Sequence, residues 1–389
     1  MIRATTLADT IEWLNDSCPG SATVDQVLSE LCGRLIDHGV PLSYGGIYVR
    51  TLHPEIMGRR FVWRPDMPFE TTSVGYDLFD DPEYRDSPIA WVFKTGQPLR
   101  RRLCDPDCPM DFTFLDRFRA AGATDLMISP LRYSSGEVHV AAWMTRRPGG
   151  FLEDAIETLR AVERPITRMT EIRTLKRVAI NLLDTYVGGQ AGGRILSGHI
   201  RRGDIEAIRA VIWLSDMRGF TARADRMPAA DLVELLNRYF DCQVPTIREA
   251  GGEVLKFMGD GLLAIFPVGA QEEGAVCGAV LAAARRIEAA VAGADWGGHE
   301  APGGVKFGVA LHIGEVMYGN VGSTNRLDFT CIGPAVNLAA RIEALSGEIG
   351  RTILASRAFA AHAPEGALTP LGAFSLKGVA APQTVYGVD

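Results

Sequence analysis

The sequence predicts an α+β protein of two domains joined by a helical connector. Strand-like apolar runs alternate with amphipathic helical segments along most of the chain. A segment with helical periodicity, 151–186, is followed by a glycine-rich stretch, 187–203, which separates the two domains. The chain has 389 residues, of which 47% are hydrophobic and 22% charged, enough for two cores. We therefore divide the chain into 1–150, 151–203 and 204–389.

The first domain, residues 1–150, combines helices with a group of strand-like runs. Helical periodicity covers 7–14, 24–36, 87–95 and 111–121, and strand-like runs cover 44–50, 61–64, 125–133 and 138–145. This order is similar to that of GAF and PAS domains, a fold-level resemblance that implies a sensor module with an unknown small-molecule or protein effector. Trp63, Trp91 and Trp143 fit either a ligand pocket or ordinary core packing.

The connector, residues 151–203, predicts a helix followed by a hinge. Apolar residues recur every three or four positions from Leu152 to Leu182, and Pro165 should kink or divide the helix. Such a stripe fits either packing on the helix's own domain or dimerisation with a second helix, and we favour dimerisation. The six glycines between Val187 and Gly203 favour a permissive, hinge-like backbone.

The second domain, residues 204–389, begins with the order β-α-β-β-α-β. Its predicted elements are a strand at 210–214, a helix at 229–250 interrupted at Pro245, a strand–turn–strand unit at 251–266, a helix at 270–291, strands at 306–312, 315–318 and 327–332, a helix at 335–344, and late strands at 352–355, 373–376 and 384–387. This order is the ferredoxin-like split β-α-β pattern, an antiparallel sheet with helices, followed by a C-terminal extension.

Two aspartates occupy the ends of predicted strands in this domain. Asp216 comes just past an apolar run and before a Gly-Phe-Thr turn, and Asp260 lies at the tip of a Gly-Asp-Gly hairpin. Each is also the kind of residue that ordinary turns prefer. Two such carboxylates can lie side by side in an antiparallel sheet, where they could hold two divalent cations for phosphoryl or nucleotidyl transfer.

Three blocks of this domain resemble the signature blocks of the class III nucleotidyl cyclases. They are Ser-Asp-Met-Arg-Gly-Phe-Thr at 215–221, Lys-Phe-Met-Gly-Asp-Gly at 256–261 and Asp-Phe-Thr-Cys-Ile-Gly-Pro-Ala-Val-Asn-Leu-Ala-Ala-Arg-Ile-Glu at 328–343. The resemblance covers roughly residues 205–389. It implies a bacterial-type adenylate cyclase domain that converts ATP to 3′,5′-cyclic AMP and pyrophosphate with two divalent cations, Mg²⁺ or Mn²⁺.

The resemblance also implies which residues bind the metals and the phosphates. Asp216, Asp260 and the backbone carbonyl of Met217 match the metal ligands of the family. The turn formed by Gly219, Phe220 and Thr221 matches the segment whose amides hold phosphate, and Lys377 matches a phosphate-binding lysine.

The base-binding positions favour ATP over GTP. Lys256 matches a position that is lysine in adenylyl cyclases and typically glutamate in guanylyl cyclases, and Thr330 matches its partner position. A lysine donor and a threonine hydroxyl suit the ring nitrogen and the amino group of adenine. Guanylyl cyclases often carry cysteine at the partner position, and Cys331 is the neighbouring residue. The family spacing from Thr330 to Asn337 and Arg341 favours Thr330.

Asn337 and Arg341 are one helical turn apart and share a helix face. In the family they orient the ribose and stabilise the charge of the transition state. Pro334 replaces the aspartate that many relatives have, and proline suits a first helical turn. The family takes its metal aspartates from one protomer and its Lys, Thr, Asn and Arg from the other. The resemblance therefore implies a head-to-tail homodimer with two equivalent sites.

The composition and charge of the chain argue against several other classes of function. The net charge of −7 gives no support to a nucleic-acid partner. No apolar run approaches the length of about 20 residues that a membrane-spanning helix needs, and the N-terminus does not look like a signal peptide. Seven scattered cysteines favour reduced thiols and a cytoplasmic location. Cys104 and Cys108 have no second Cys or His pair nearby in the sequence to complete a metal site.

Three alternative functions remain on the sequence alone. A guanylate cyclase would rely on Cys331. A diguanylate cyclase would rely on Gly251-Gly252-Glu253, but the residues that follow fit that family's motif poorly. A non-catalytic nucleotide-sensing protein would be expected to lack a metal aspartate or the transition-state arginine, and here all of them are present.

Overall fold

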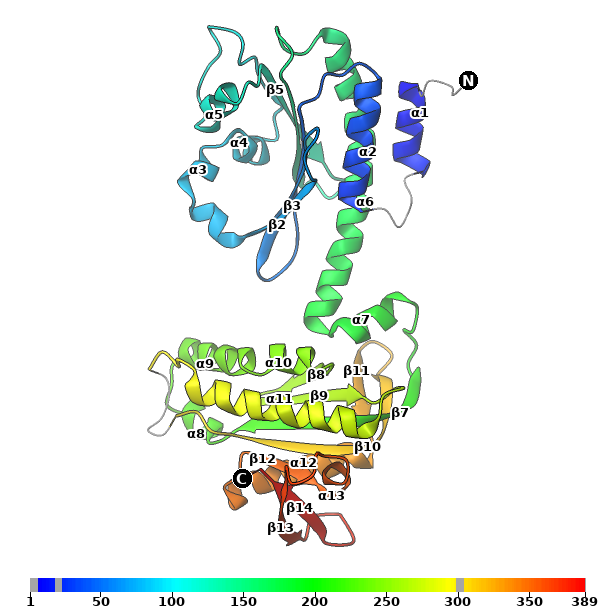
Figure 1. Cartoon of the computed structure of the whole chain (residues 1–389), viewed down its shortest axis with the longest axis vertical. Coiled ribbons are helices and arrows are strands. Elements are labelled where there is room, and N and C mark those ends of the chain that lie inside the picture. Colours follow the sequence, from blue (N-terminus) through cyan, green and yellow to red (C-terminus); the bar gives the residue numbers. More distant parts are fainter. Residues whose placement is uncertain (1–5, 18–22, 299–303, 389) are drawn as a thin grey trace. The chain divides into compact units, whose positions relative to one another are not determined.

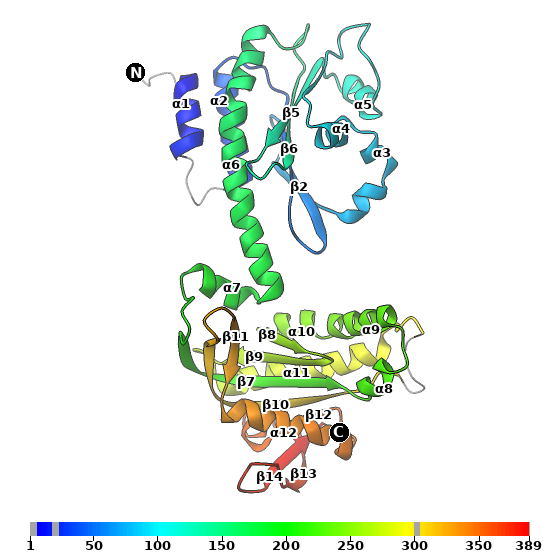
Figure 2. The ribbon, with the colours of Figure 1, turned by 180° about the vertical axis from the view of Figure 1, so that it is seen from behind.

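The computed structural model describes residues 6–17, 23–298 and 304–388. The chain divides into two compact units, Met1–Leu182 and Leu183–Asp389, which Figures 1 and 2 show from opposite sides. The boundary after Leu182 thus falls inside the expected connector, residues 151–203, and divides it between the two units. No helix in the described part of the chain is long and apolar enough to cross a lipid bilayer.

Unit 1 is built on a six-stranded antiparallel sheet with the strand order β3-β2-β1-β6-β5-β4. The strands are β1 (Tyr44–Arg50), β2 (Ile56–Trp63), β3 (Glu70–Gly75), β4 (Leu99–Arg101), β5 (Asp125–Arg132) and β6 (Val138–Thr145), and the helices are α1 (Leu7–Glu12), a π-helical turn (Trp13–Ser17), α2 (Val24–Asp37), a 3₁₀ turn (Tyr76–Asp80), α3 (Pro82–Arg85), α4 (Pro88–Thr95), α5 (Phe114–Ala120) and α6 (Glu153–Tyr186). The predicted α+β character of this region is confirmed. The GAF or PAS resemblance stays a prediction.

The two faces of this sheet carry separate apolar clusters. Helices α2 and α6 cover one face, where Trp143 is fully buried and Trp63 packs at the edge of the cluster. Helices α4 and α5 cover the other face, where Trp91 packs against Phe112. A cavity of about 460 Å³ lies on this second face, and none of the three tryptophans lines it among the residues that the structure describes.

Helix α6 is a single helix through Pro165, so the predicted division at this proline is wrong. Proline removes only one backbone donor, and its cost is offset where the surrounding turns are well packed. Pro165 is itself buried, and Leu159, Val162 and Ile166 beside it pack into the apolar cluster under α2.

The glycine-rich stretch after α6 is also more ordered than the sequence predicts. Helix α7 (Gly189–Leu196) occupies the expected hinge. Its Ala191 is fully buried, and the Ala191 amide donates a hydrogen bond of 2.8 Å to the Glu253 carboxylate. A Cβ atom on Gly192 would lie 3.0 Å from Cβ of Leu183, so a small residue allows α7 to pack closely on the end of α6.

Unit 2 contains an eight-stranded sheet with the order β13-β14-β12-β10-β7-β9-β8, and β11 pairs with β10 outside this path. The strands are β7 (Ile205–Met217), β8 (Glu253–Met258), β9 (Gly261–Pro267), β10 (Phe307–Gly322), β11 (Leu327–Ile332), β12 (Ile353–Ser356), β13 (Thr369–Phe374) and β14 (Gln383–Gly387), and the helices after α7 are α8 (Phe220–Ala224), α9 (Ala229–Asp241), α10 (Val244–Glu249), α11 (Glu273–Gly293), α12 (Pro334–Ile349) and α13 (Arg357–Ala360).

The predicted β-α-β-β-α-β order is confirmed by β7, β8, β9 and β10, which are arranged β10-β7-β9-β8 with every neighbour antiparallel. The strands predicted at 306–312 and 315–318 form one strand, β10, which pairs with every residue of β7. The helix predicted at 229–250 is two helices, because Pro245 lies in the first turn of a new helix, α10.

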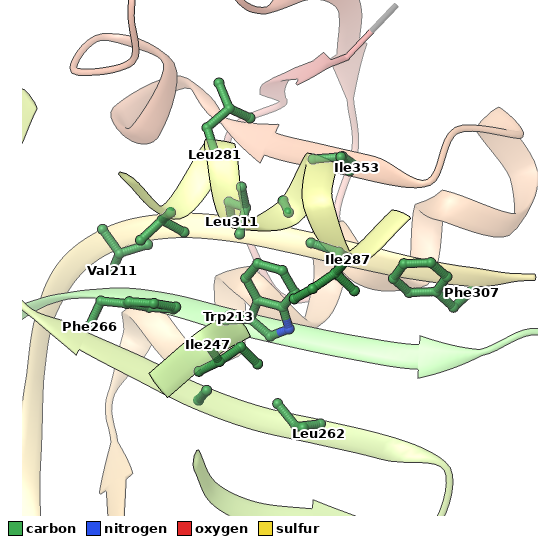
Figure 3. Packing of buried hydrophobic residues seen from close by; sticks show 14 of the residues in the cluster. Val211, Trp213, Ile247, Leu262, Phe266, Leu281, Ile287, Phe307, Leu311 and Ile353 are labelled. Atoms are coloured by element: carbon green, nitrogen blue, oxygen red, sulfur yellow. The ribbon is translucent and has the colours of Figure 1, made fainter. Parts of the chain in front are cut away.

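Helices α9, α10 and α11 cover one face of this sheet, as Figures 1 and 2 show. Trp213 of β7 is fully buried there, among Ile247 of α10, Ile287 of α11 and Phe266 of β9 (Figure 3). The opposite face is covered by α7, β11 and the start of α12. Because both faces of β7 are buried, its end is held at a fixed place in the sheet.

Candidate active site

Asp216 is the penultimate residue of β7, inside the strand and not past its end as predicted. The strand is longer than its apolar run because β10 pairs with all of it, and Gly308 is the cross-strand partner of Asp216. The Asp216 side chain is partly buried. The sheet therefore presents this carboxylate at a defined position beside the turn between β8 and β9.

Asp260 lies in that turn, between two glycines with different roles. Gly259 has φ +70°, in the left-handed region that favours glycine. A Cβ atom on Gly261 would lie 3.1 Å from Oδ1 of Asp216 and 3.2 Å from the Ser215 carbonyl oxygen. Glycine therefore lets the turn approach the end of β7 closely, which brings Asp260 next to Asp216.

The two carboxyl groups affect each other directly. Burial, together with the charges of the neighbouring Asp260 and Glu343 carboxylates, raises the pKa of Asp216 to about 7. Burial also raises the pKa of Asp260, although hydrogen bonds from Asp216 and from the Met217 backbone act in the opposite direction. Such a pair is an acceptor-rich, partly desolvated site for a cation.

Sequence reasoning missed a third carboxylate, Glu343 of α12. It packs over Gly308, since a Cβ atom there would lie 2.9 Å from Oε1 of Glu343, and it accepts a hydrogen bond of 3.3 Å from Ser346. Burial raises the Glu343 pKa, and the nearby Arg218 guanidinium lowers it. The third sequence block ends at Glu343, so the residue was within reach of the sequence argument. In the helix, Glu343 follows the buried Ile342 and lies one turn before the buried Ser346.

The residues predicted to hold phosphate follow Asp216 in the chain. Gly219 has φ +70° and precedes α8, so the amides of Phe220 and Thr221 are the first two of that helix. The first amides of a helix have no partner within it and are available to an anion. Phe220 also packs against the core, and Thr221 is exposed. The turn is thus anchored on one side and open on the other.

The base-reading candidates form a second group on β8 and β11. Nζ of Lys256 lies 2.7 Å from Oδ2 of Asp328, a residue that sequence reasoning quoted but gave no role. Asp328 and Thr330 share one face of β11 because side chains alternate along a strand. Phe329 and Cys331 point the other way, into the apolar cluster with Tyr318. Lys256, Asp328 and Thr330 therefore lie on the same side.

Three further candidates are exposed. Asn337 and Arg341 lie one turn apart on the open face of α12, and Pro334 occupies the first turn of that helix, where proline was expected to fit. Lys377 is exposed in the segment between β13 and β14. These three side chains lie at the surface, whereas the Asp216 side chain is partly buried.

The donor set suits a cation shared with a ligand more than a metal held by protein alone. Within the described ranges, no group of three or more His, Cys, Asp or Glu side chains is arranged to hold a metal ion. Asp216 and Asp260 supply two carboxylates, and a cation bound there would take its other ligands from backbone, water or phosphate.

Comparison with known proteins finds a family whose catalytic domain is similar to the second unit. Residues 206–388 match the family model of the adenylate and guanylate cyclase catalytic domain. Unit 2 is therefore similar to the catalytic domains of this family. The match agrees with the antiparallel sheet and with the order of the three sequence blocks.

Individual relatives are similar to the same region. A terminal-differentiation-specific adenylate cyclase of Dictyostelium discoideum is 35% identical over 156 residues, which are 39% of this chain and 7% of that protein. An adenylate cyclase of Anabaena cylindrica is 33% identical over 156 residues, 40% of this chain and 31% of that protein. The chain thus spans less than a third of the length of either relative. The crystal structure of the adenylyl cyclase CyaB from P. aeruginosa matches 48% of this chain and 95% of its own with 24% identity and a TM-score of 0.41.

Proposed function

We propose that the protein is an adenylate cyclase that converts ATP to 3′,5′-cyclic AMP and pyrophosphate, under the control of unit 1. The observation that carries the proposal is the adjacency of Asp216 and Asp260, which the Gly261 turn brings together at the end of β7. Two neighbouring carboxylates with few competing partners fit divalent cations that also bind a triphosphate. Both curated relatives described above are adenylate cyclases.

The chain's own residues have distinct tasks in this reaction. Asp216, Asp260 and the Met217 carbonyl would hold two divalent cations, Mg²⁺ or Mn²⁺, and the amides of Phe220 and Thr221 would bind phosphate oxygens. Bound there, the cations supply activation of the ribose 3′ hydroxyl and neutralisation of the triphosphate. Asn337 would orient the ribose, and Arg341 would stabilise the charge on the α-phosphate, with Lys377 on the leaving phosphates.

The base-reading candidates on β8 and β11 support ATP as the substrate. Lys256 is a donor for an adenine ring nitrogen, and the Thr330 hydroxyl is an acceptor for the amino group. Cys331, the residue that would favour a guanylate cyclase, is buried in the apolar cluster on the opposite side of β11. The orientation of β11 therefore adds a physical argument to the family spacing.

The proposed site is shared between two copies of the chain in a head-to-tail homodimer. The charges that act on the Asp216 carboxyl come from Asp260 and Glu343, whereas Lys256 pairs with Asp328 on a different part of the fold. Asn337 and Arg341 lie on an open helix face, as expected of side chains that reach into a partner's site. Two-fold symmetry then gives two equivalent sites.

Regulation by unit 1 is supported by its cavity. The cavity of about 460 Å³ is large enough for a small molecule, and its walls include Tyr44, Tyr48, Phe93 and Phe118 beside the guanidinium groups of Arg50 and Arg60. We assign to it the effector of the cyclase.

An assay of the purified full chain tests this function. The protein is incubated with ATP or GTP and with Mn²⁺ or Mg²⁺, and both cyclic nucleotides are quantified beside an Asp216→Asn control. Cyclic AMP from the parent chain and none from the control is the expected result. Cyclic GMP as the main product would overturn the roles of Lys256 and Thr330, and nucleotide binding without turnover would point to a regulatory protein.

A further inference from the structure

Unit 1 contains a second cavity, on the side of its sheet that α2 and α6 cover. Its volume of about 410 Å³ is large enough for a small organic molecule. Val49 of β1 and Phe61 of β2 line it from the sheet, and both belong to the apolar cluster under those helices. The first residues of α2 and the segment 173–180 of α6 line it from the helices. The adenylate cyclase reaction proposed above makes no use of this cavity.

Positive charge dominates the lining of this cavity. Four of the lining side chains are cationic: Arg59, Arg173, Lys176 and Arg177. Asp25 is the only carboxylate that lines it among the residues that the structure describes. In the same part of the chain, Arg59, Lys176 and Arg177 have no ion-pair partner. Burial lowers the pKa of Arg59, and the nearby charge of Arg177 lowers it further. Cations gathered in this way repel one another, and a bound anion relieves the repulsion.

The Thr51 hydroxyl adds a polar group without a partner. Thr51 directly follows β1 and lines the cavity. Its hydroxyl oxygen is buried, and within the described ranges it has no hydrogen-bond partner. Buried polar groups are nearly always hydrogen-bonded, so an unpartnered one beside a cavity is expected where a ligand or an ion completes the site. We propose that this cavity binds the phosphate groups of a small phosphorylated metabolite.

Phosphate suits this set of side chains better than a single carboxylate does. A phosphate monoester carries a charge of about −1.5 to −2 at neutral pH and has three acceptor oxygens. It can therefore accept hydrogen bonds from two of the cationic groups at the same time, and guanidinium groups bind phosphate oxygens in pairs. One carboxylate offers a single charge and two oxygens. The apolar side chains of Phe61 and Ile180 provide contact area for the organic part of the ligand.

Titration calorimetry of the full chain tests the site. Fructose 1,6-bisphosphate is the phosphorylated probe, fructose is the uncharged control and citrate is the carboxylate control, all at one ionic strength. Nucleotide is left out and a chelator is present, so the result does not depend on the proposed cyclase activity. The variant Lys176→Gln/Arg177→Gln removes two cations of the cavity. The matched control, Arg164→Gln/Arg168→Gln, removes two exposed cations that lie elsewhere on α6. Arg59 is kept, because it also lines the larger cavity of unit 1.

The parent chain and the control variant are expected to bind fructose 1,6-bisphosphate with the same affinity, more tightly than citrate, and not to bind fructose. In Lys176→Gln/Arg177→Gln the dissociation constant of the bisphosphate should rise at least about 10-fold, because charge-assisted hydrogen bonds to phosphate are lost. No binding of the bisphosphate by the parent chain would overturn the proposal, as would equal affinities of the two double variants. Citrate binding as tight as that of the bisphosphate would overturn the assignment of phosphate.

Discussion

The ammonium group of Lys256 on β8 lies 2.7 Å from a carboxylate oxygen of Asp328 on β11. Asp328 is two residues before Thr330 and on the same face of its strand. The ion pair therefore joins the two strands that carry the proposed base-reading residues. The hydrogen bond from Lys256 lowers the pKa of Asp328, so the carboxylate remains charged at neutral pH.

Replacing this carboxylate should weaken ATP binding more than catalysis. In Asp328→Asn the Lys256 ammonium loses its charged partner, and we expect KM for ATP to rise by up to about 5-fold with kcat changed little, because exposed ion pairs contribute at most about 1 kcal/mol. Steady-state kinetics measure the effect. Glu365→Gln, an exposed acid elsewhere on the unit, is the control and should behave like the parent chain.

The two neighbouring residues on β11 should differ in their effect on the choice of nucleotide. Thr330→Ala removes a neutral hydrogen bond to the base, and we expect kcat/KM for ATP to fall about 3- to 10-fold. Cys331→Ala changes only the apolar cluster and should leave the ratio of ATP to GTP turnover unchanged. A large change of that ratio in Cys331→Ala, with none in Thr330→Ala, would reverse the assignment of the two positions.

Much of unit 2 was predictable because its signals are local. The apolar runs of β7 and β9, the glycine-flanked turn at Asp260 and the periodicity of α11 each fix one element from nearby residues. The order of these elements then fixes a split β-α-β sheet. The sequence blocks add the residues of the candidate site, because their spacing can be matched without knowledge of the fold.

Asp216 should make a contribution to the stability of the metal-free protein that is lost as the pH rises toward neutrality. The pKa of Asp216 is raised from 3.8 to about 7, so the folded chain binds this proton more tightly than the unfolded chain. The contribution of this proton to the free energy of unfolding is fully present below about pH 4 and is lost as the pH rises through about 7. Asp216→Asn removes the charge, and we expect it to be more stable than the parent chain at pH 8 by about 1–2 kcal/mol, after allowance for solvent screening.

Denaturant unfolding at pH 5 and at pH 8, with a chelator present, measures this difference. Asp225→Asn, a change of an exposed aspartate at the end of α8, is the control; it keeps Asp216 and should match the parent chain at both pH values. Equal stabilities of Asp216→Asn and the parent chain at both pH values would contradict the account of the paired carboxyl groups.

The contact between α7 and the sheet should contribute measurably to the stability of unit 2. The Tyr318 hydroxyl donates a hydrogen bond to the buried Glu253 carboxylate, which also accepts one from the Ala191 amide. Tyr318→Phe leaves a buried acceptor with one donor fewer, and we expect a loss of about 1–3 kcal/mol in the free energy of unfolding. Tyr186→Phe makes the same chemical change on an exposed side chain and should cost less than about 0.5 kcal/mol.

The features that the sequence did not reveal depend on distant contacts. Helix α7 forms in a glycine-rich segment because Glu253, more than sixty residues later, accepts the hydrogen bond of its Ala191 amide. Pro165 stays inside α6 because the sheet of unit 1 packs on that helix. Glu343 joins the aspartate pair only because Gly308 is the cross-strand partner of Asp216. Local patterns cannot carry such information.

The shared site can be tested directly by mixing two inactive variants. Asp216→Asn removes the metal side of the site and Arg341→Ala removes the transition-state side, and each variant alone should produce almost no cyclic AMP. If one protomer supplies Asp216 and the other Arg341, half of the dimers in an equal mixture are mixed, and each mixed dimer keeps one intact site of two. We therefore predict about a quarter of the parent activity in the mixture. A mixture as inactive as its components, from dimers shown to exchange subunits, would contradict a site shared between two copies.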